Sequence, residues 1–326
     1  MLRLPIHSTA FPTSIAEAVA LRVEAGAAGA YVAGGTDLYP NMKRRQQEPR
    51  RVIDVRRIPE LGRLEVREDG TLAVGAGVTL TRFLSDTRVR SGWPALAHAA
   101  SEISTPLLRN MGTVGGNLLL DTRCNYYDQG YEWRKAIHFC MKKDGDTCWV
   151  APSSPRCWAV QSSDLVPVVV AVGARVVLAG PDGERTLPAA ALYHDDGMAF
   201  LTKQPNELLV RLEVPPLTHA RASYKKLRRR GSFDFPVLGV AAWAAFDGAG
   251  RVTAARIVLG AVGSFPKVVE EAGAALVGGT LTDEEIDEAA RRASKLAKPL
   301  DNTDFTIGWR KEMAAVFVGR AVEGLR

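Results

Sequence analysis

Every cysteine of the chain lies in one short segment, and this clustering limits the possible folds and functions more than any other feature of the sequence. The four residues are Cys124, Cys140, Cys148 and Cys157. A glycine-rich turn at residues 112–117 precedes the segment, and Ser163-Asp164-Leu165 follows it. Cysteines confined in this way indicate a shared role, such as ligation of one metal centre or a small set of disulfides. Residues 118–161 therefore form an insert with its own chemistry.

The expected compartment argues against disulfides. The N-terminus, Met1 to His7, lacks the features of a secretory signal, and no run is apolar enough to span a membrane, so we expect a cytoplasmic protein with reduced thiols. No Cys-x-x-Cys pair of the kind common in structural zinc sites occurs, although His138 beside Cys140 could add a nitrogen ligand. A 4Fe–4S cluster, zinc, and disulfides or free thiols all stay open; the wide spacing is compatible with the cluster but does not by itself choose among them.

Two glycine-rich turns predict a site for a phosphate-bearing ligand. The first, Gly34-Gly35-Thr36, follows a predicted strand at residues 30–33, and the second spans Gly112 to Asn117. Glycine lets backbone N–H groups approach an anion closely because no Cβ intervenes, and the polar side chains of the turns add donors. We expect the turns to hold one extended ligand from opposite sides. The Gly-x-Gly-x-x-Gly fingerprint is absent, so a Rossmann nucleotide site is not supported.

Hydrophobic patterns and cap residues predict an α+β protein of two domains. Ser14 and Glu17 form a capping-box pattern before a helix that ends near Ala25. Pro215-Pro216 and the polar joint after it indicate a boundary, which divides the chain into residues 1–218 and 219–326. We predict strands at 51–55, 64–66, 72–74, within 165–178, at 207–214, 237–246 and 251–262, and helices at 94–100, 106–110, 267–276, 282–296 and 306–324.

The charge of the chain gives little support for nucleic-acid binding. The net charge is +6, and a basic run extends from Lys225 to Arg230. This run stands alone, without interleaved aromatic residues, and the other charges are mixed along the chain. We therefore expect neither nucleic acid nor a membrane as a partner.

The glycine turns and their neighbours resemble motifs of a known family. Ala33 to Leu38, Arg109 to Asn117 and Ser163-Asp164-Leu165 are similar to motifs of the FAD-binding subunits of the xanthine dehydrogenase family of molybdenum hydroxylases. The resemblance spans nearly the whole chain. It implies a two-lobed FAD-binding domain of the PCMH (vanillyl-alcohol-oxidase-like) type, followed by a smaller C-terminal domain of antiparallel sheet plus helices. The FAD contacts that it implies are Tyr31, Val32, Ala33, Gly34, Gly35, Thr36, Asp37, Leu38, Ile103, Thr113, Val114, Gly115, Gly116, Asn117, Asp164 and Lys225.

The insert resembles that of one group in the family, the β subunits of 4-hydroxybenzoyl-CoA reductases. Segments 118–129 and 140–148 carry this similarity. It implies that Cys124, Cys140, Cys148 and Cys157 bind a 4Fe–4S cluster. It further implies a heterohexamer, a dimer of heterotrimers, that contains a large molybdenum-cofactor subunit and a small 2Fe–2S subunit. Reduced ferredoxin would supply electrons for the dehydroxylation of 4-hydroxybenzoyl-CoA to benzoyl-CoA, a step of anaerobic aromatic catabolism.

This resemblance assigns no acid, base or nucleophile to the chain, because the cofactors supply the chemistry. Lys142 and Lys143 are expected to attract an acidic ferredoxin. Two other functions stay open. One is a FAD subunit of a different molybdenum hydroxylase whose insert binds zinc, and the other is a zinc-stabilised scaffold or docking subunit without a redox role.

Overall fold

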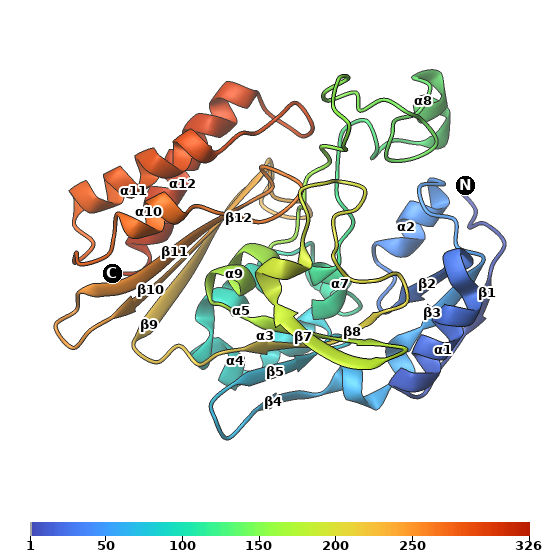
Figure 1. Ribbon diagram of the computed structural model, residues 1–326, viewed down its shortest axis with the longest axis horizontal. Helices are drawn as coiled ribbons and strands as arrows, with labels where there is room; N and C mark the ends of the chain where they lie inside the picture. The colour runs from blue at the N-terminus through green and yellow to red at the C-terminus, as the bar shows by residue number, and fades with distance from the viewer. Residues whose placement is uncertain (1) are drawn as a thin grey trace.

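The computed structural model describes residues 2–326 and contains three β-sheets (Figure 1). In the N-terminal lobe, β3 lies between β1 and β2 in a parallel sheet. The hydroxyl of Ser14 accepts a hydrogen bond from the Glu17 N–H at 3.2 Å, as predicted, but the Glu17 carboxylate bonds to the N–H of Thr13 instead, so only half of the capping box forms. The elements are β1 (Ser8–Ala10), α1 (Ile15–Ala25), β2 (Gly29–Val32), α2 (Leu38–Lys43) and β3 (Arg51–Asp54), with 3-10 helices at Gly26–Ala28, Val55–Arg57 and Pro59–Gly62.

The second lobe is built on an antiparallel sheet with the strand order β4-β5-β8-β6-β7. The pairing of Leu64 with Val74 confirms the predicted hairpin. The elements are β4 (Leu64–Val66), β5 (Leu72–Gly75), α3 (Leu80–Ser85), α4 (Thr87–Gly92), α5 (Pro94–Ser101), α6 (Pro106–Arg109), α7 (Val114–Leu118), α9 (Leu165–Ala171), β6 (Arg175–Gly180), β7 (Gly183–Pro188), a 3-10 helix (Ala189–Leu192) and β8 (Leu208–Val214).

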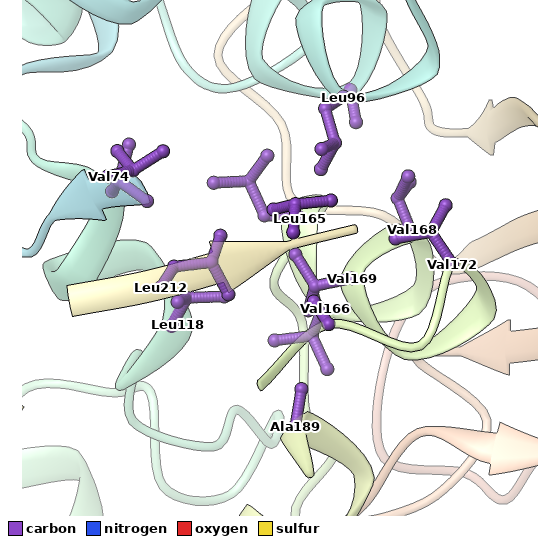
Figure 2. Close-up of a cluster of buried hydrophobic side chains, with 14 of the residues drawn as sticks. Val74, Leu96, Leu118, Leu165, Val166, Val168, Val169, Val172, Ala189 and Leu212 are labelled. Atoms are coloured by element: carbon purple, nitrogen blue, oxygen red, sulfur yellow. The ribbon is translucent and has the colours of Figure 1, made fainter. Parts of the chain in front are cut away.

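Helix α9 lies in the centre of the second lobe's core, and the prediction of strands over residues 165–178 is wrong for the first half of that range. All the residues of α9 are buried. A helix enclosed on every side is apolar all round, so periodicity cannot distinguish its sequence from that of a buried strand. Pro167 is tolerated because it lies in the first turn, where its missing N–H breaks no helical hydrogen bond. Figure 2 shows the surrounding side chains, which include Val74, Leu96, Leu118, Ala189 and Leu212.

The C-terminal part is a four-stranded antiparallel sheet that is covered on one face by helices α10 to α12 (Figure 1). Its opposite face contacts α5 and α9 of the second lobe. The long predicted hairpin is confirmed, and α11 begins with the predicted capping box between Thr282 and Glu285. The helix predicted over 267–276 is shorter, because a strand occupies its first residues. The elements are β9 (Ala220–Leu227), β10 (Leu238–Phe246), β11 (Val252–Gly260), β12 (Lys267–Val268), α10 (Glu270–Ala274), α11 (Asp283–Leu296) and α12 (Ile307–Glu323).

The insert leaves the second lobe and returns to it at a single backbone pairing. Arg123 and Val160 exchange both N–H···O hydrogen bonds, at 2.8 and 2.7 Å. Beyond this pair the chain is largely irregular, carries the short helix α8 (Tyr131–Ala136), and rises above the two lobes in Figure 1.

Contacts on two sides hold the insert in place. The buried Arg134 guanidinium donates hydrogen bonds to the carbonyl oxygens of Arg44 and Arg45 in the N-terminal lobe, at 2.9 and 3.1 Å. From the C-terminal part, the Asn302 side-chain amide donates to the carbonyl oxygen of Trp158 at 2.7 Å. The insert is therefore fixed between the N-terminal lobe and the C-terminal part.

Two surface properties bear on possible partners. The basic run that begins the C-terminal part is engaged in ion pairs, which are Lys226–Asp164, Arg228–Glu102, Arg229–Asp304 and Arg230–Asp234, with N···O distances of 3.0, 2.8, 3.2 and 2.5 Å. Within residues 2–326, no helix has the length and apolar character that crossing a membrane requires.

Candidate functional site

A cavity of about 620 Å³ lies where the two lobes, the insert and the segment before β10 meet. Both glycine turns line it, together with Ile103 and Asp164. Of the predicted FAD contacts, Val114 and Lys225 are the two that do not line the cavity; Val114 is buried in the core of the second lobe. Sequence reasoning missed several of the lining side chains, which include Arg44, Arg123, Phe200, Lys203 and Phe235.

The two glycine turns touch each other, so they form adjoining parts of one wall. A Cβ on Gly34 would lie 1.8 Å from the carbonyl oxygen of Met111, and only glycine permits this approach. Similarly, a Cβ on Gly115 would lie 2.5 Å from the Cβ of Ala76. The second turn is further fixed by the Thr113 hydroxyl, which accepts a hydrogen bond from the Gly116 N–H at 3.0 Å.

The first turn offers unused backbone donors to the cavity. In the part of the chain that the structure describes, the N–H groups of Gly34, Gly35, Thr36 and Asp37 donate to no protein acceptor. Successive free N–H groups in a glycine-rich turn form a concave site that suits an anion such as a phosphate. This observation fits a ligand that carries a diphosphate.

Asp37 connects the first turn to the insert. Its carboxylate forms an ion pair with Arg123 and accepts a hydrogen bond from the Asn41 side chain at 3.0 Å. Burial raises the pKa of Asp37 above its usual value, and the Arg123 guanidinium opposes this shift. Because Arg123 directly precedes Cys124, the wall of the cavity and the cysteine segment are parts of one packed unit.

Asp164 lies at the contact between the cavity and the C-terminal sheet. It accepts hydrogen bonds from the Tyr224 hydroxyl at 2.8 Å and from the Lys226 ammonium at 3.0 Å. Burial raises the pKa of Asp164 to about 6, although the Lys226 charge opposes the shift. Alternate residues of strand β9 point to the same face, so Tyr224 and Lys226 both reach Asp164. The predicted Lys225 lies between them.

All four cysteines are free and buried. Cys124, Cys140 and Cys157 share one apolar cluster with Tyr127. Burial is the main cause that raises the pKa of Cys124 to about 12 and that of Cys157 to about 11, and neighbouring cysteines contribute to both shifts, Cys148 to that of Cys157. Buried thiols with such high pKa values stay protonated near neutral pH, whereas a bound metal centre would stabilise their thiolate forms. Thiolates are ligands that both zinc and iron–sulfur centres take, but within residues 2–326 no group of three or more His, Cys, Asp or Glu side chains is arranged to hold a metal ion.

Lys142 does not lie on the surface, contrary to the expectation that it attracts ferredoxin. Its side chain is 6% exposed, and its ammonium lies 2.8 Å from the Asp121 carboxylate. Lys143 is 28% exposed and pairs with Asp144 at 3.0 Å. A buried, paired ammonium contributes little to long-range attraction of a partner.

The fold and the site define a subunit that binds an extended, phosphate-bearing cofactor between two lobes. Residues 6–217 match the family described as the FAD binding domain in molybdopterin dehydrogenase, and residues 222–325 match the CO dehydrogenase flavoprotein C-terminal domain. The chain belongs to this family, the FAD-binding subunits of molybdenum hydroxylases. It is thus an oxidoreductase subunit with FAD as its cofactor, and the predicted fold class is confirmed.

Individual relatives agree with this assignment. The chain is 30% identical over 315 residues to the carbon monoxide dehydrogenase medium chain of Afipia carboxidovorans, which covers 96% of this chain and 94% of the relative. It is 33% identical over 258 residues to the FAD-binding subunit of an aldehyde oxidoreductase of Escherichia coli, covering 76% and 79% of the two chains. In carbon monoxide dehydrogenase from Hydrogenophaga pseudoflava, a chain superposes with a TM-score of 0.81 at 28% identity, covering 99% and 98%.

Proposed function

We propose that this chain is the FAD and 4Fe–4S subunit of a 4-hydroxybenzoyl-CoA reductase, and that it passes electrons from reduced ferredoxin towards a molybdenum subunit. The observation that carries the proposal is the group of four buried, free cysteines beside the flavin cavity. The cluster's ligands would be Cys124, Cys140, Cys148 and Cys157. Bound FAD and a 4Fe–4S cluster would supply electron transfer, and FAD can exchange electrons singly or in pairs.

In this proposal the residues of the chain bind the FAD, position it and shield the cluster from water. The free N–H groups of residues 34–37 would hold the FAD diphosphate, with the Thr113–Asn117 turn beside them. The packed side chains around the cysteines keep water from the sulfur atoms, since each cysteine residue is at most 7% exposed. Exclusion of water and the charges close to such a centre are the means by which a protein sets its reduction potential.

The spacing along the sequence weakens zinc as the metal, because structural zinc sites usually contain a Cys-x-x-Cys pair and none occurs here. Within residues 2–326, no group of three or more His, Cys, Asp or Glu side chains is arranged to hold a metal ion. The proposed cluster therefore rests on the chemistry of the four buried thiols and on the resemblance of the insert. Similarity to carbon monoxide dehydrogenase and aldehyde oxidoreductase subunits supports one part of the alternative, a FAD subunit of another molybdenum hydroxylase; the zinc-binding insert of that alternative rests on the cysteines alone.

The proposed complex is a dimer of heterotrimers that also contains a large molybdenum-cofactor subunit and a small 2Fe–2S subunit. Curated relatives are named as a medium chain or as FAD-binding subunits, which supports a multi-subunit enzyme. Four free cysteines support a location in the reducing cytoplasm.

Metal analysis of anaerobically purified protein tests the cluster. We expect about four irons and four labile sulfides for each FAD. Changing Cys157 to serine should abolish stoichiometric iron binding and leave flavin bound, because this residue does not line the cavity. Met141→Leu is the matched control, since it replaces a sulfur-containing neighbour of Cys140 that is not a proposed ligand. Zinc in place of iron would support the alternative, and zinc without flavin would indicate a scaffold.

The substrate needs a separate test. When the partner subunits are co-expressed, we expect the complex to convert 4-hydroxybenzoyl-CoA to benzoyl-CoA with reduced ferredoxin. A complex that holds iron and FAD but oxidises carbon monoxide or an aldehyde would retain the electron-transfer role and exclude the proposed reaction.

A further inference from the structure

Lys142 places a positive charge inside the insert, away from water. Its ammonium donates hydrogen bonds to Asp121 (2.8 Å), to the Thr122 hydroxyl (2.8 Å) and to the carbonyl oxygen of Gly197 (2.7 Å). The rings of Tyr127 and Phe200 cover it, with the nitrogen 4.8 and 5.5 Å from their centroids. With its donors satisfied and water excluded, this charge acts on its surroundings with little screening.

Gly197 connects this ammonium to one of the cysteines. The Gly197 N–H donates a hydrogen bond to the carbonyl oxygen of Cys157 at 2.9 Å. A Cβ on Gly197 would lie 2.8 Å from the Cys157 sulfur, so the glycine backbone is packed directly against that atom. The same residue therefore contacts the sulfur and accepts a hydrogen bond from Lys142. One glycine residue separates the buried charge from the sulfur.

Two other neighbours of Lys142 face the flavin cavity. Asp121 and Phe200 both line that cavity. Asp121 also accepts hydrogen bonds from the Tyr127 hydroxyl at 3.0 Å and from the Gln47 side chain at 3.2 Å. The ion pair is thus oriented, with its ammonium towards the sulfur of Cys157 and its carboxylate towards the cavity.

We propose that Lys142 is a positioning residue that raises the reduction potential of the cysteine-bound cluster, with Asp121 as its counter-charge on the flavin side. The inference rests on the proposed 4Fe–4S cluster. Reduction adds one electron to the cluster and breaks no bond, so a fixed positive charge nearby stabilises the reduced form more than the oxidised form. Lys142 would act on the energy of electron transfer and not on docking of the donor.

A purely structural role is the competing explanation, because the ion pair also ties residue 142 to residues 121 and 122. Such a role affects folding and iron retention, but it does not change the potential of a cluster that remains bound. The potential is therefore the measurement that separates the two explanations.

The test is an EPR-monitored redox titration of the anaerobically purified full-length chain, after its iron, sulfide and flavin contents are measured. We expect Lys142→Gln to lower the midpoint potential of the cluster by about 59 mV, which is a tenfold change in the reduction equilibrium for one electron. Lys142→Arg keeps the charge and should restore most of the wild-type potential. The matched control, Lys143→Gln, removes an adjacent but more exposed charge and should leave the potential unchanged.

Each outcome decides a different point. A Lys142→Gln protein with full iron and the wild-type potential would overturn the inference and leave the proposed function intact. If that variant loses its iron, Asp121→Asn provides the test, because it keeps the ammonium and removes its counter-charge. A raised potential in Asp121→Asn then supports the inference, and an unchanged one overturns it. A wild-type chain without four irons and labile sulfide removes the proposed cluster, and the inference with it.

Discussion

Replacing Gly34 with alanine is expected to give a protein that purifies without flavin. The added Cβ would lie 1.8 Å from the Met111 carbonyl oxygen, well inside van der Waals contact, so the two glycine turns must separate. Separation displaces the free N–H groups of residues 34–37 that face the cavity. The overlap should also cost about 1–3 kcal/mol of folding free energy. Flavin absorbance per chain and the thermal unfolding midpoint measure the two effects.

Gly92→Ala is the matched control for this substitution. Gly92 ends helix α4, and a Cβ there would meet no atom within 4 Å. The variant should bind flavin as the wild type does and should be no less stable, since alanine is the better helix former. A Gly34→Ala protein with a full complement of flavin would show that the contact between the turns is not needed to hold the cofactor.

The second large effect is expected from Asp164→Asn. The Lys226 ammonium and its partner carboxylate are only 1% and 4% exposed as side chains, so the substitution leaves a positive charge buried without a counter-charge. Loss of one partner from a buried ion pair costs about 3–5 kcal/mol. The Tyr224 hydroxyl also loses its charged acceptor. Urea unfolding monitored by circular dichroism should show a large decrease in stability, accompanied by weaker flavin binding because residue 164 lines the cavity.

Two further variants test whether the unpaired Lys226 charge causes this loss of stability. The double variant Asp164→Asn/Lys226→Met removes both charges and should regain much of the lost stability, because an apolar replacement avoids an unpaired charge. Glu288→Gln breaks two surface ion pairs, with Arg291 and Arg292, and should change the unfolding free energy by less than about 1 kcal/mol for each pair. Equal losses in Asp164→Asn and in the double variant would exclude the uncompensated charge as the cause.

Local chemistry explains which features could be predicted from sequence. The glycine turns were predictable because their steric requirement depends on residue type, and the hairpin of the C-terminal sheet because its strands flank a glycine-containing turn. Helix α9 was not, because its β-branched residues favour strands until the surrounding core encloses them. The cysteines were visible as a group, but their burial depends on contacts with residues far away in the chain.

The same reasoning applies to individual residues. Lys226 and Lys225 are adjacent in the sequence, and only the register of β9 shows which one faces Asp164. Lys142 resembles a surface lysine until Asp121 and Gly197 are brought to it by folding. Arg123 and Phe200 belong to the cavity for the same reason, and no local pattern marks them.

The closed base of the insert has a consequence for how such a subunit can evolve. Arg123 and Val160 stand opposite each other, so the chain leaves and re-enters the fold at nearly the same point. The flanking segments also hold each other directly, because the Ser163 hydroxyl donates a hydrogen bond to the Asn117 side chain at 2.6 Å. A single insertion or deletion event at this junction can therefore add or remove the whole cysteine segment while the flanking helices keep their places, so a flavoprotein can gain this segment without rebuilding its flavin site.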